Sequence, residues 1–189
     1  MATNDRESLR WVVDDLAYHQ ARVLLLIAAV AAQPGHAKKM DGLTKLAKLD
    51  FLVRNPALAG VVLDKLQEDE PKMHLLDGEV SSLPDVEDPM VRYKYGPWDD
   101  KYYPVVGALV SRGLVKYAKG RQGSIALVAT NLGRQLVETL KSDMLWGLTS
   151  DRCETIATAS VGLSGNQLKE LIYARLIDLI DRPQRELIS

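Results

Sequence analysis

Residues 90–140 constrain the fold more than any other part of the chain. The centre of this stretch predicts two short strands, residues 114–119 and 124–129, joined by the turn Gly120-Arg-Gln-Gly123. Gly113 stands directly before the first strand, where it can end a preceding helix in a left-handed turn. The stretch therefore predicts a two-stranded hairpin that follows directly on a helix.

Helices are predicted on both sides of this hairpin. Asp99 or Asp100 can cap a helix that runs to Arg112, with Pro104 in the first turn, where its missing N–H costs no hydrogen bond. Thr130 can cap the helix that follows the hairpin. The apolar positions of this second helix have helical spacing: Leu132, Leu136, Val137 and Leu140.

Two helices are predicted near the start of the chain. Residues 9–33 form the first, and Pro34-Gly35 ends it. Asp41 can cap the second, in which Lys45 and Lys48 are expected on the polar side. Its apolar positions follow helical spacing: Leu43, Leu46, Ala47, Leu49 and Val53.

A third helix, an acidic segment and a short strand follow. Asn55-Pro56 is a strong helix start, with Leu58, Val62, Leu63 and Leu66 as the buried stripe. Residues 67–90 hold eight acids and one base, which predicts a loop insertion. This segment could be a solvated connector, a mimic of phosphate backbone or a docking strip. Residues 91–95 then alternate as a strand would, and Gly96-Pro97 is expected to turn the chain.

This order of elements is typical of a winged helix-turn-helix, with residues 99–112 in the position of the recognition helix. The expected fold class is therefore mainly α with a small β-wing (α+β). We expect a winged helix-turn-helix domain over residues 9–142, interrupted by the acidic insertion, and a C-terminal helical extension over residues 143–189.

The extension predicts two more helices, with Thr149-Ser150 and Ser164 as caps. The last helix spans residues 166–180, and roughly 40 residues are too few to enclose its apolar stripe alone. The stripe is therefore expected either to bind a partner or to clamp across the winged helix. Its residues are the candidate partner interface: Leu168, Leu171, Ile172, Leu176, Leu179 and Ile180.

Positive charge is concentrated in one part of the sequence. The formal net charge of -1 gives no general attraction to DNA, but residues 91–121 hold seven bases and two acids. Bases on or near a wing can contact the phosphate backbone, although a solvated wing tip is an equal alternative. The candidate nucleic-acid contacts are Lys101, Arg112, Lys116, Lys119 and Arg121. The tyrosines of this region are assigned mainly to packing, with base stacking or partner contact as the alternative.

Nothing in the sequence indicates catalysis, a metal or a cofactor. Cys153 is the only cysteine, which excludes a disulfide framework and fits a reducing cytoplasm. The three histidines lack the spacing of metal ligands, and motifs for serine nucleophiles and phosphate-binding loops are absent. The longest apolar run, residues 23–32, is about half of the roughly 20 residues that cross a bilayer. We expect a cytoplasmic, non-enzymatic protein without a membrane partner.

Several stretches resemble known families. Ala129-Thr-Asn-Leu-Gly-Arg-Gln-Leu-Val-Glu-Thr-Leu140 resembles the segment that follows the wing in many bacterial winged-helix proteins. Lys45-Leu-Ala-Lys-Leu-Asp-Phe-Leu-Val-Arg-Asn-Pro56, Tyr93-Lys-Tyr-Gly-Pro-Trp-Asp-Asp-Lys-Tyr-Tyr-Pro104 and Val110-Ser-Arg-Gly-Leu-Val115 resemble the middle components of bacterial ABC-three-component defence systems, the group to which Lamassu belongs. The pattern is also similar to Panacea-type antitoxin domains.

The resemblance to ABC-three-component systems implies an adaptor between an SMC-like or ABC-like ATPase and an effector, often a nuclease. The alternative is a dimeric DNA-binding regulator or antitoxin that reads an operator through Lys101, Arg112 and the wing. The recognition position favours the adaptor, because its residues offer few side chains that can hydrogen-bond base edges: Val105, Val106, Gly107, Ala108, Leu109 and Val110.

Overall fold

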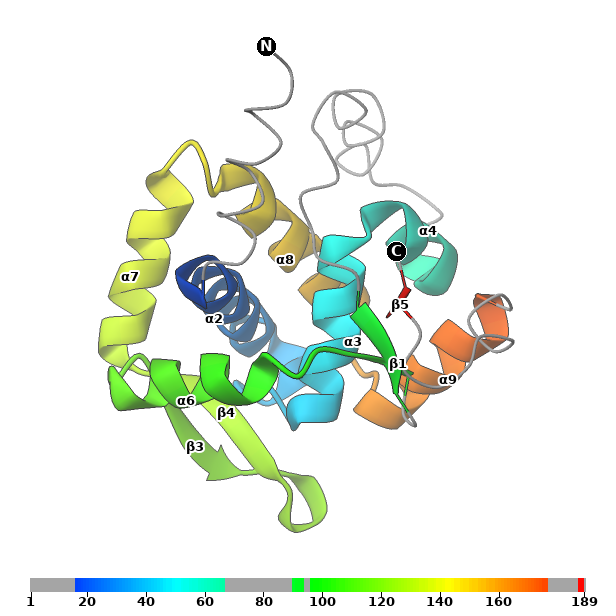
Figure 1. Cartoon of the computed structure of the whole chain (residues 1–189), viewed down its shortest axis with the longest axis horizontal. Helices are drawn as coiled ribbons and strands as arrows, with labels where there is room; N and C mark the ends of the chain where they lie inside the picture. Colours follow the sequence, from blue (N-terminus) through cyan, green and yellow to red (C-terminus); the bar gives the residue numbers. More distant parts are fainter. Residues whose placement is uncertain (1–15, 67–89, 94–95, 177–186, 189) are drawn as a thin grey trace.

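The computed structural model describes residues 16–66, 90–93, 96–176 and 187–188. This part of the chain is mainly helical, with seven α-helices and small antiparallel sheets, which confirms the expected α+β class (Figure 1). Almost all of the acidic segment, residues 67–89, lies outside the described residues.

Helix α2, Leu16–Ala32, is the centre of the molecule, as Figure 1 shows. It packs against α6, α7, α8 and strand β4. A helix that is enclosed in this way is apolar on most sides, and the run from Val23 to Ile27 is buried without interruption. The 3-10 helix η1, Pro34–His36, follows directly, which confirms the predicted end of the helix.

Helix α3, Leu43–Arg54, differs from its prediction in two ways. Its N-cap is Gly42, with φ 95°, because the Asp41 carboxylate instead accepts a hydrogen bond from the backbone N–H of Arg121. The expected polar side is also wrong, because Lys45 and Lys48 are both buried. Helix α4, Pro56–Val62, begins at Asn55-Pro56 as predicted, and the 3-10 helix η2, Asp64–Leu66, follows it.

Strand β1, Met90–Tyr93, pairs antiparallel with both β2, Gly96–Trp98, and β5, Leu187–Ile188. The three strands form a sheet of order β2-β1-β5. Gly96-Pro97 therefore belongs to a strand and is not the predicted turn. In the antiparallel ladder Arg92 pairs with Pro97 and Tyr93 pairs with Gly96. Gly96 and Pro97 are therefore paired strand residues.

Helix α6, Tyr102–Ser111, has Lys101 at its N-cap, so the prediction that Asp99 or Asp100 caps it is wrong. The Asp99 carboxylate accepts from the backbone N–H of Lys101, and Asp100 accepts from the indole of Trp98. Pro104 lies in the first turn, and Gly113 has φ 69° directly after the helix. Both of these last two predictions are confirmed.

The hairpin of strands β3, Val115–Lys119, and β4, Ile125–Ala129, is confirmed, with the short 3-10 turn η4, Arg121–Gly123, between them. Met40 adds an antiparallel bridge to Leu127 on the outer edge of β4. Helix α7, Asn131–Ser142, follows, and the Thr130 hydroxyl accepts from the N–H of Gly133 as predicted. The hairpin projects from the helical body in Figure 1.

Helices α8, Gly147–Ala159, and α9, Gly165–Arg175, end the described helical part. Helix α8 begins after Trp146, so Ser150 is a buried residue inside it and not a cap. Ser164 forms the predicted cap, completed by a reciprocal bond from Gln167. Helix α8 lies along α2, and α9 lies on α3, so both helices share the central core.

Candidate functional site

The hairpin brings three of the predicted nucleic-acid contacts together. Lys116 and Lys119 are exposed on β3, and Arg121 stands in the turn with 74% of its side chain exposed. In the ladder, Lys116 faces Val128 and Lys119 faces Ile125. Neither partner position is acidic, so the cations of the strand are not neutralised across the hairpin.

Contacts with the segment before α3 hold the hairpin in place. The backbone N–H of Arg121 donates to Oδ1 of Asp41 at 2.9 Å, and the side chain of Arg121 lies 3.5 Å from Oδ2. Lys39 donates through Nζ to the carbonyl oxygen of Lys119 at 2.8 Å. A side chain at Gly120 would meet the carboxylate of Asp41, so this close approach requires glycine. The hairpin therefore presents its basic side chains from a fixed position.

Two further bases, Lys38 and Arg134, lie near the basic side chains of the hairpin, and the sequence analysis did not identify them. Lys38 is exposed next to Lys39, and the left-handed backbone at Ala37 and Lys38, with φ 53° and 58°, turns the chain toward the hairpin. Arg134 lies on α7 and, with Lys116, lines a hollow of about 430 Å³ between the hairpin and the start of that helix. The sequence analysis counted positive charge over residues 91–121 only. Lys38 and Arg134 lie outside that stretch, and only the fold brings them near the hairpin.

The other two candidate contacts lie at opposite ends of α6. Arg112 follows the last turn of α6 and is exposed, but its Nη1 donates to Oε1 of Gln20 at 2.8 Å. Lys101 is half-buried at the opposite end of α6, beside Asp99. The structure therefore separates Lys101 from the basic hairpin by the length of a helix.

Helix α6 exposes little that could read a base sequence. Val105, Val106 and Leu109 are buried in the core. The exposed positions of the helix are Tyr103, Pro104, Gly107 and Ser111. Only Tyr103 and Ser111 carry hydrogen-bonding groups, and neither can make the bidentate contact that distinguishes one base pair from another.

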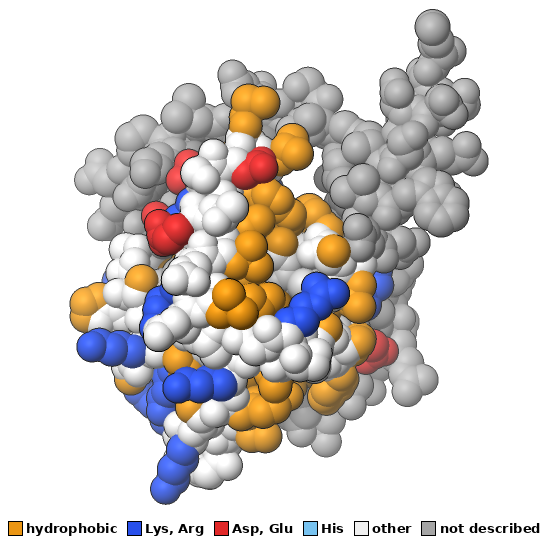
Figure 2. Space-filling view, turned by 90° about the vertical axis from the view of Figure 1, so that its left-hand side faces the viewer, with side chains coloured by type: hydrophobic (Ala, Val, Ile, Leu, Met, Phe, Trp, Pro, Cys, Tyr) orange, Lys and Arg blue, Asp and Glu red, His pale blue; other side chains and the backbone are white. Residues whose placement is uncertain are grey.

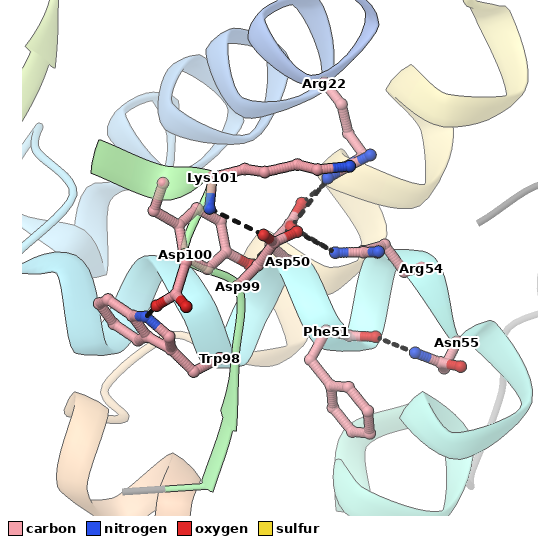
Figure 3. Close-up of polar contacts among 10 residues, drawn as sticks. Arg22, Asp50, Phe51, Arg54, Asn55, Trp98, Asp99, Asp100 and Lys101 are labelled. Atoms are coloured by element: carbon pink, nitrogen blue, oxygen red, sulfur yellow. Dashed lines mark hydrogen bonds and ion pairs between the residues drawn. The ribbon is translucent and has the colours of Figure 1, made fainter. Parts of the chain in front are cut away.

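A buried ion-pair network fixes the start of α6 (Figure 3). Arg22 of α2 donates to both carboxylate oxygens of Asp50 at 2.8 and 3.1 Å, and the Tyr102 hydroxyl donates to Asp50 at 2.7 Å. Arg54 donates to Asp99 at 3.0 Å. The network thus ties α2, α3 and the segment before α6 to one another.

The charges of this network determine how its acid titrates. Burial alone would raise the pKa of Asp50, but the neighbouring Arg22 and Arg54 and the hydrogen bonds that Arg22 and Tyr102 donate hold it below its ordinary value. Burial and the Asp50 charge raise the pKa of Tyr102. Asp50 is therefore ionised and Tyr102 neutral in the folded protein. In these states the two side chains hold α2, α3 and α6 together.

The two buried lysines of α3 also hold elements together. Lys45 donates through Nζ to the carbonyl of Leu163 at 2.5 Å and lies 3.0 Å from Nδ1 of His36. The Nε2 of His36 lies 2.8 Å from the carbonyl of Ala157, which requires Nε2 to carry the proton. Lys48 donates to the carbonyl of Pro97 at 3.0 Å. Burial lowers the pKa of Lys45 and of Lys48 to about 8.

The predicted partner stripe of the last helix lies mostly against the chain itself. Leu168 and Ile172 have no exposed surface, and Leu171 and Leu176 pack half-buried on the same core. Leu179 and Ile180 lie outside the described residues. The stripe is covered by α3 and α4, so Leu168 and Ile172 are not available to a partner, which corrects the interface assignment for these two residues.

The described residues offer little for catalysis. Cys153 is buried, and burial raises the pKa of its thiol. His19 is buried with neither ring nitrogen hydrogen-bonded, and burial lowers its pKa. No group of three metal-ligating side chains occurs in residues 16–66, 90–93 or 96–176. Within the same described residues, no helix has both the length and the apolar character that spanning a bilayer requires.

Comparison of the chain with protein-family models, with curated proteins and with solved structures found no match. Function therefore has to be inferred from the residues and their geometry.

Proposed function

We propose that the protein is a non-enzymatic winged-helix adaptor that contacts duplex DNA through its basic hairpin, without sequence preference, while its helical surface holds a protein partner. The observation that carries this proposal is the hairpin itself. Lys116, Lys119 and Arg121 are exposed on an element that projects from the body of the molecule, where they can approach a phosphate backbone (Figure 1).

The order of the described elements supports a winged-helix assignment. Helix α2, the extended segment at Met40, α3, α6 and the hairpin follow one another in the chain, with α4, η2, β1 and β2 inserted before α6. Met40 bridges to Leu127, so a third extended segment, from between the first two helices, joins the hairpin. Under the proposed winged-helix assignment, α6 is the recognition helix and β3–β4 is the wing.

The exposed surface of α6 supports contact without sequence preference. Sequence readout requires side chains such as Arg, Asn or Gln at base edges, and the exposed positions of α6 are Tyr103, Pro104, Gly107 and Ser111. Contacts to phosphate position a protein on a duplex but carry no sequence information. The second candidate, an operator-reading regulator, lacks a supporting observation on this helix.

The adaptor role rests on the resemblance to middle components of ABC-three-component systems. It implies an SMC-type or ABC-type ATPase and an effector nuclease as partners. Co-expression with the ATPase of such a system from the same operon should give a stable complex, and this complex should survive loss of the hairpin bases, because DNA and ATPase would use different surfaces.

DNA binding can be tested with a hairpin variant in which Lys116, Lys119 and Arg121 are all replaced by Ala. Binding to a short duplex should weaken, and the slope of log Kd against log salt should fall by about 0.9 for each phosphate that the variant no longer neutralises. The control replaces Lys65 on η2 and Lys169 and Arg175 on α9, elements that pack on α3, α4 and α8, and it makes the same change in net charge. The control should keep most of the wild-type affinity and slope.

Two results would count against this assignment. Equal losses of affinity in the hairpin variant and the control would show that net charge matters and the hairpin does not. Tight binding to one sequence, with large losses on single base changes, would favour the operator-reading regulator.

A further inference from the structure

One strip of the surface is apolar although it is exposed. It comprises Leu132 and Leu136 on α7, Met144 and Leu145 in the turn after it, and Leu148 on α8. Met144 is 93% exposed and Leu145 is 82% exposed. Figure 2 shows hydrophobic side chains gathered in a strip across this face of the molecule. We call these five residues the α7 strip.

The α7 strip is separate from the side of α7 that builds the core. Gly133 and Val137 are the buried residues of α7, and the helix packs through this side on α2 and β4. Leu132 and Leu136 lie one turn apart on the neighbouring side and are 54% and 37% exposed. Exposed apolar side chains that gather on one face of a folded chain are typical of an interaction surface.

Charge is distributed unequally along the α7 strip. At its Leu132 end, Lys116 and Arg134 line the same hollow as Leu132. At its other end, Asp143 directly precedes Met144, and Asp151 lies about one helical turn from Leu148; both acids are exposed. In Figure 2 acidic side chains lie beside the upper end of the strip and basic side chains beside its lower part. The strip thus has a basic end and an acidic end.

We propose that the α7 strip is the contact surface of a symmetric dimer of this chain. A two-fold axis through the middle of the strip places the basic end of one copy against the acidic end of the other, and it does so twice. The same rotation sets the apolar centre of the strip against its own copy. A surface that is complementary to itself under this rotation fits a second copy of the chain.

The dimer goes beyond the proposed DNA contact and does not depend on it. Lys119 and Arg121 lie at the turn end of the hairpin, whereas the strip meets the opposite end, where Val115 pairs with Ala129. Dimerisation therefore leaves the bases at the hairpin tip exposed.

The apolar part of the proposal can be tested by sedimentation equilibrium on the full chain. Leu136→Glu and Met144→Glu place an unpaired charge in the contact, so each should raise the dimer Kd by at least about tenfold. Both residues are exposed, and circular dichroism should show unchanged folding. Val61→Glu on α4 is the matched control, because Val61 is also exposed, at 44%, but lies away from the strip. It should leave the dimer Kd within about twofold of the wild-type value.

The charge part is tested by two complementary variants. Lys116→Glu with Arg134→Glu makes both ends of the strip acidic, and Asp143→Lys with Asp151→Lys makes both ends basic. Each variant alone should dimerise at least about tenfold more weakly than the wild type, and an equimolar mixture should form heterodimers. The mixture also shows that both variants are folded.

A wild-type chain that stays monomeric at millimolar concentration would overturn the proposal, and the strip would then belong to a different protein partner. Unchanged dimerisation of the strip variants, or a mixture that does not associate, would also overturn it. Lys116 belongs to both surfaces, so the DNA contact is tested apart from the dimer with Lys119→Ala and Arg121→Ala alone, at the turn end of the hairpin. This variant should lose affinity for DNA and keep the wild-type dimer Kd, so failure of the dimer and failure of the DNA contact can be told apart.

Discussion

Lys45 and Lys48 show how a residue can match a helical pattern and still be assigned to the wrong environment. Their spacing places them on the polar side of an isolated helix, yet both are buried, because α9 and β2 pack over that side. Each amino group reaches a backbone carbonyl, of Leu163 and Pro97 respectively. These acceptors are 118 and 49 residues away in the chain, so no local pattern could reveal them.

The lowered pKa of Lys48 predicts a pH dependence of stability. Its pKa is about 8 in the folded protein and near 10.5 in the unfolded chain, so between these values the unfolded chain binds more protons. The free energy of unfolding therefore rises as pH increases through this range. Relative to Lys48→Met, the wild type should gain about 1–2 kcal/mol between pH 7 and pH 9.5 in urea titrations.

Lys65→Met is the control for this experiment, because Lys65 is exposed and its replacement keeps both buried lysines. Its free energy of unfolding should follow the wild-type pH profile. If Lys48→Met also follows the wild-type profile, Lys48 stays charged in the fold and the assigned pKa is wrong.

At the scale of the element, sequence reasoning found the helices and the hairpin but misassigned several caps. Thr130 and Ser164 cap their helices as predicted, because each hydroxyl meets an N–H only three residues away. Asp41 and Asp99 do not cap theirs. The Asp41 carboxylate binds the N–H of Arg121, and Oδ2 of Asp99 binds the guanidinium of Arg54, groups that only the tertiary structure brings near. Oδ1 of Asp99 accepts from the N–H of Lys101, which lies before the helix begins. Capping is predictable where the acid or hydroxyl has no stronger partner.

Two glycines in helices predict opposite responses to the same substitution. Gly133 lies in the first turn of α7, where an added Cβ would collide with the carbonyl of Leu114. Gly107 lies in α6 with open space around it. Gly107→Ala should stabilise the protein by about 0.5–1 kcal/mol through helix propensity, whereas Gly133→Ala should destabilise it by about 1–3 kcal/mol through the collision.

Urea titration of the two glycine variants measures both effects. Gly107→Ala acts as the control, because it reports the gain in helix propensity without a steric cost. Equal stabilisation of both variants would mean that α7 can move away from Leu114 without loss, and that the position of α7 relative to the hairpin is not fixed.

At the scale of the whole molecule, the sequence predicts the elements better than their assembly. The hairpin and the seven helices of the described part follow from local patterns, since each depends on residues within a few positions. The ion-pair network does not, because Arg22, Asp50 and Tyr102 come from three separate helices. The apolar stripe on α9 was recognised, but only the fold shows that this chain itself covers it.

The position of α9 predicts that its stripe is a clamp on the core. Ile172 is fully buried where α9 packs on α3 and α4, so Ile172→Asp puts an unpaired charge into the centre of the fold. The loss of stability should exceed the roughly 2–5 kcal/mol of a buried Ile→Ala change, and so remove a large part of the about 5–15 kcal/mol by which an ordinary domain is folded.

Circular dichroism and urea titration of the isolated chain decide whether this clamp exists. Ala174→Asp is the control, because it adds the same charge to the same helix at an exposed position, where the expected loss is within about 0.5 kcal/mol. Unfolding of Ile172→Asp alone supports the clamp, since the damage then lies within one chain. An Ile172→Asp variant that folds as stably as the control, but no longer associates with a partner, would show instead that α9 is an interface and that its packing on α3 contributes little.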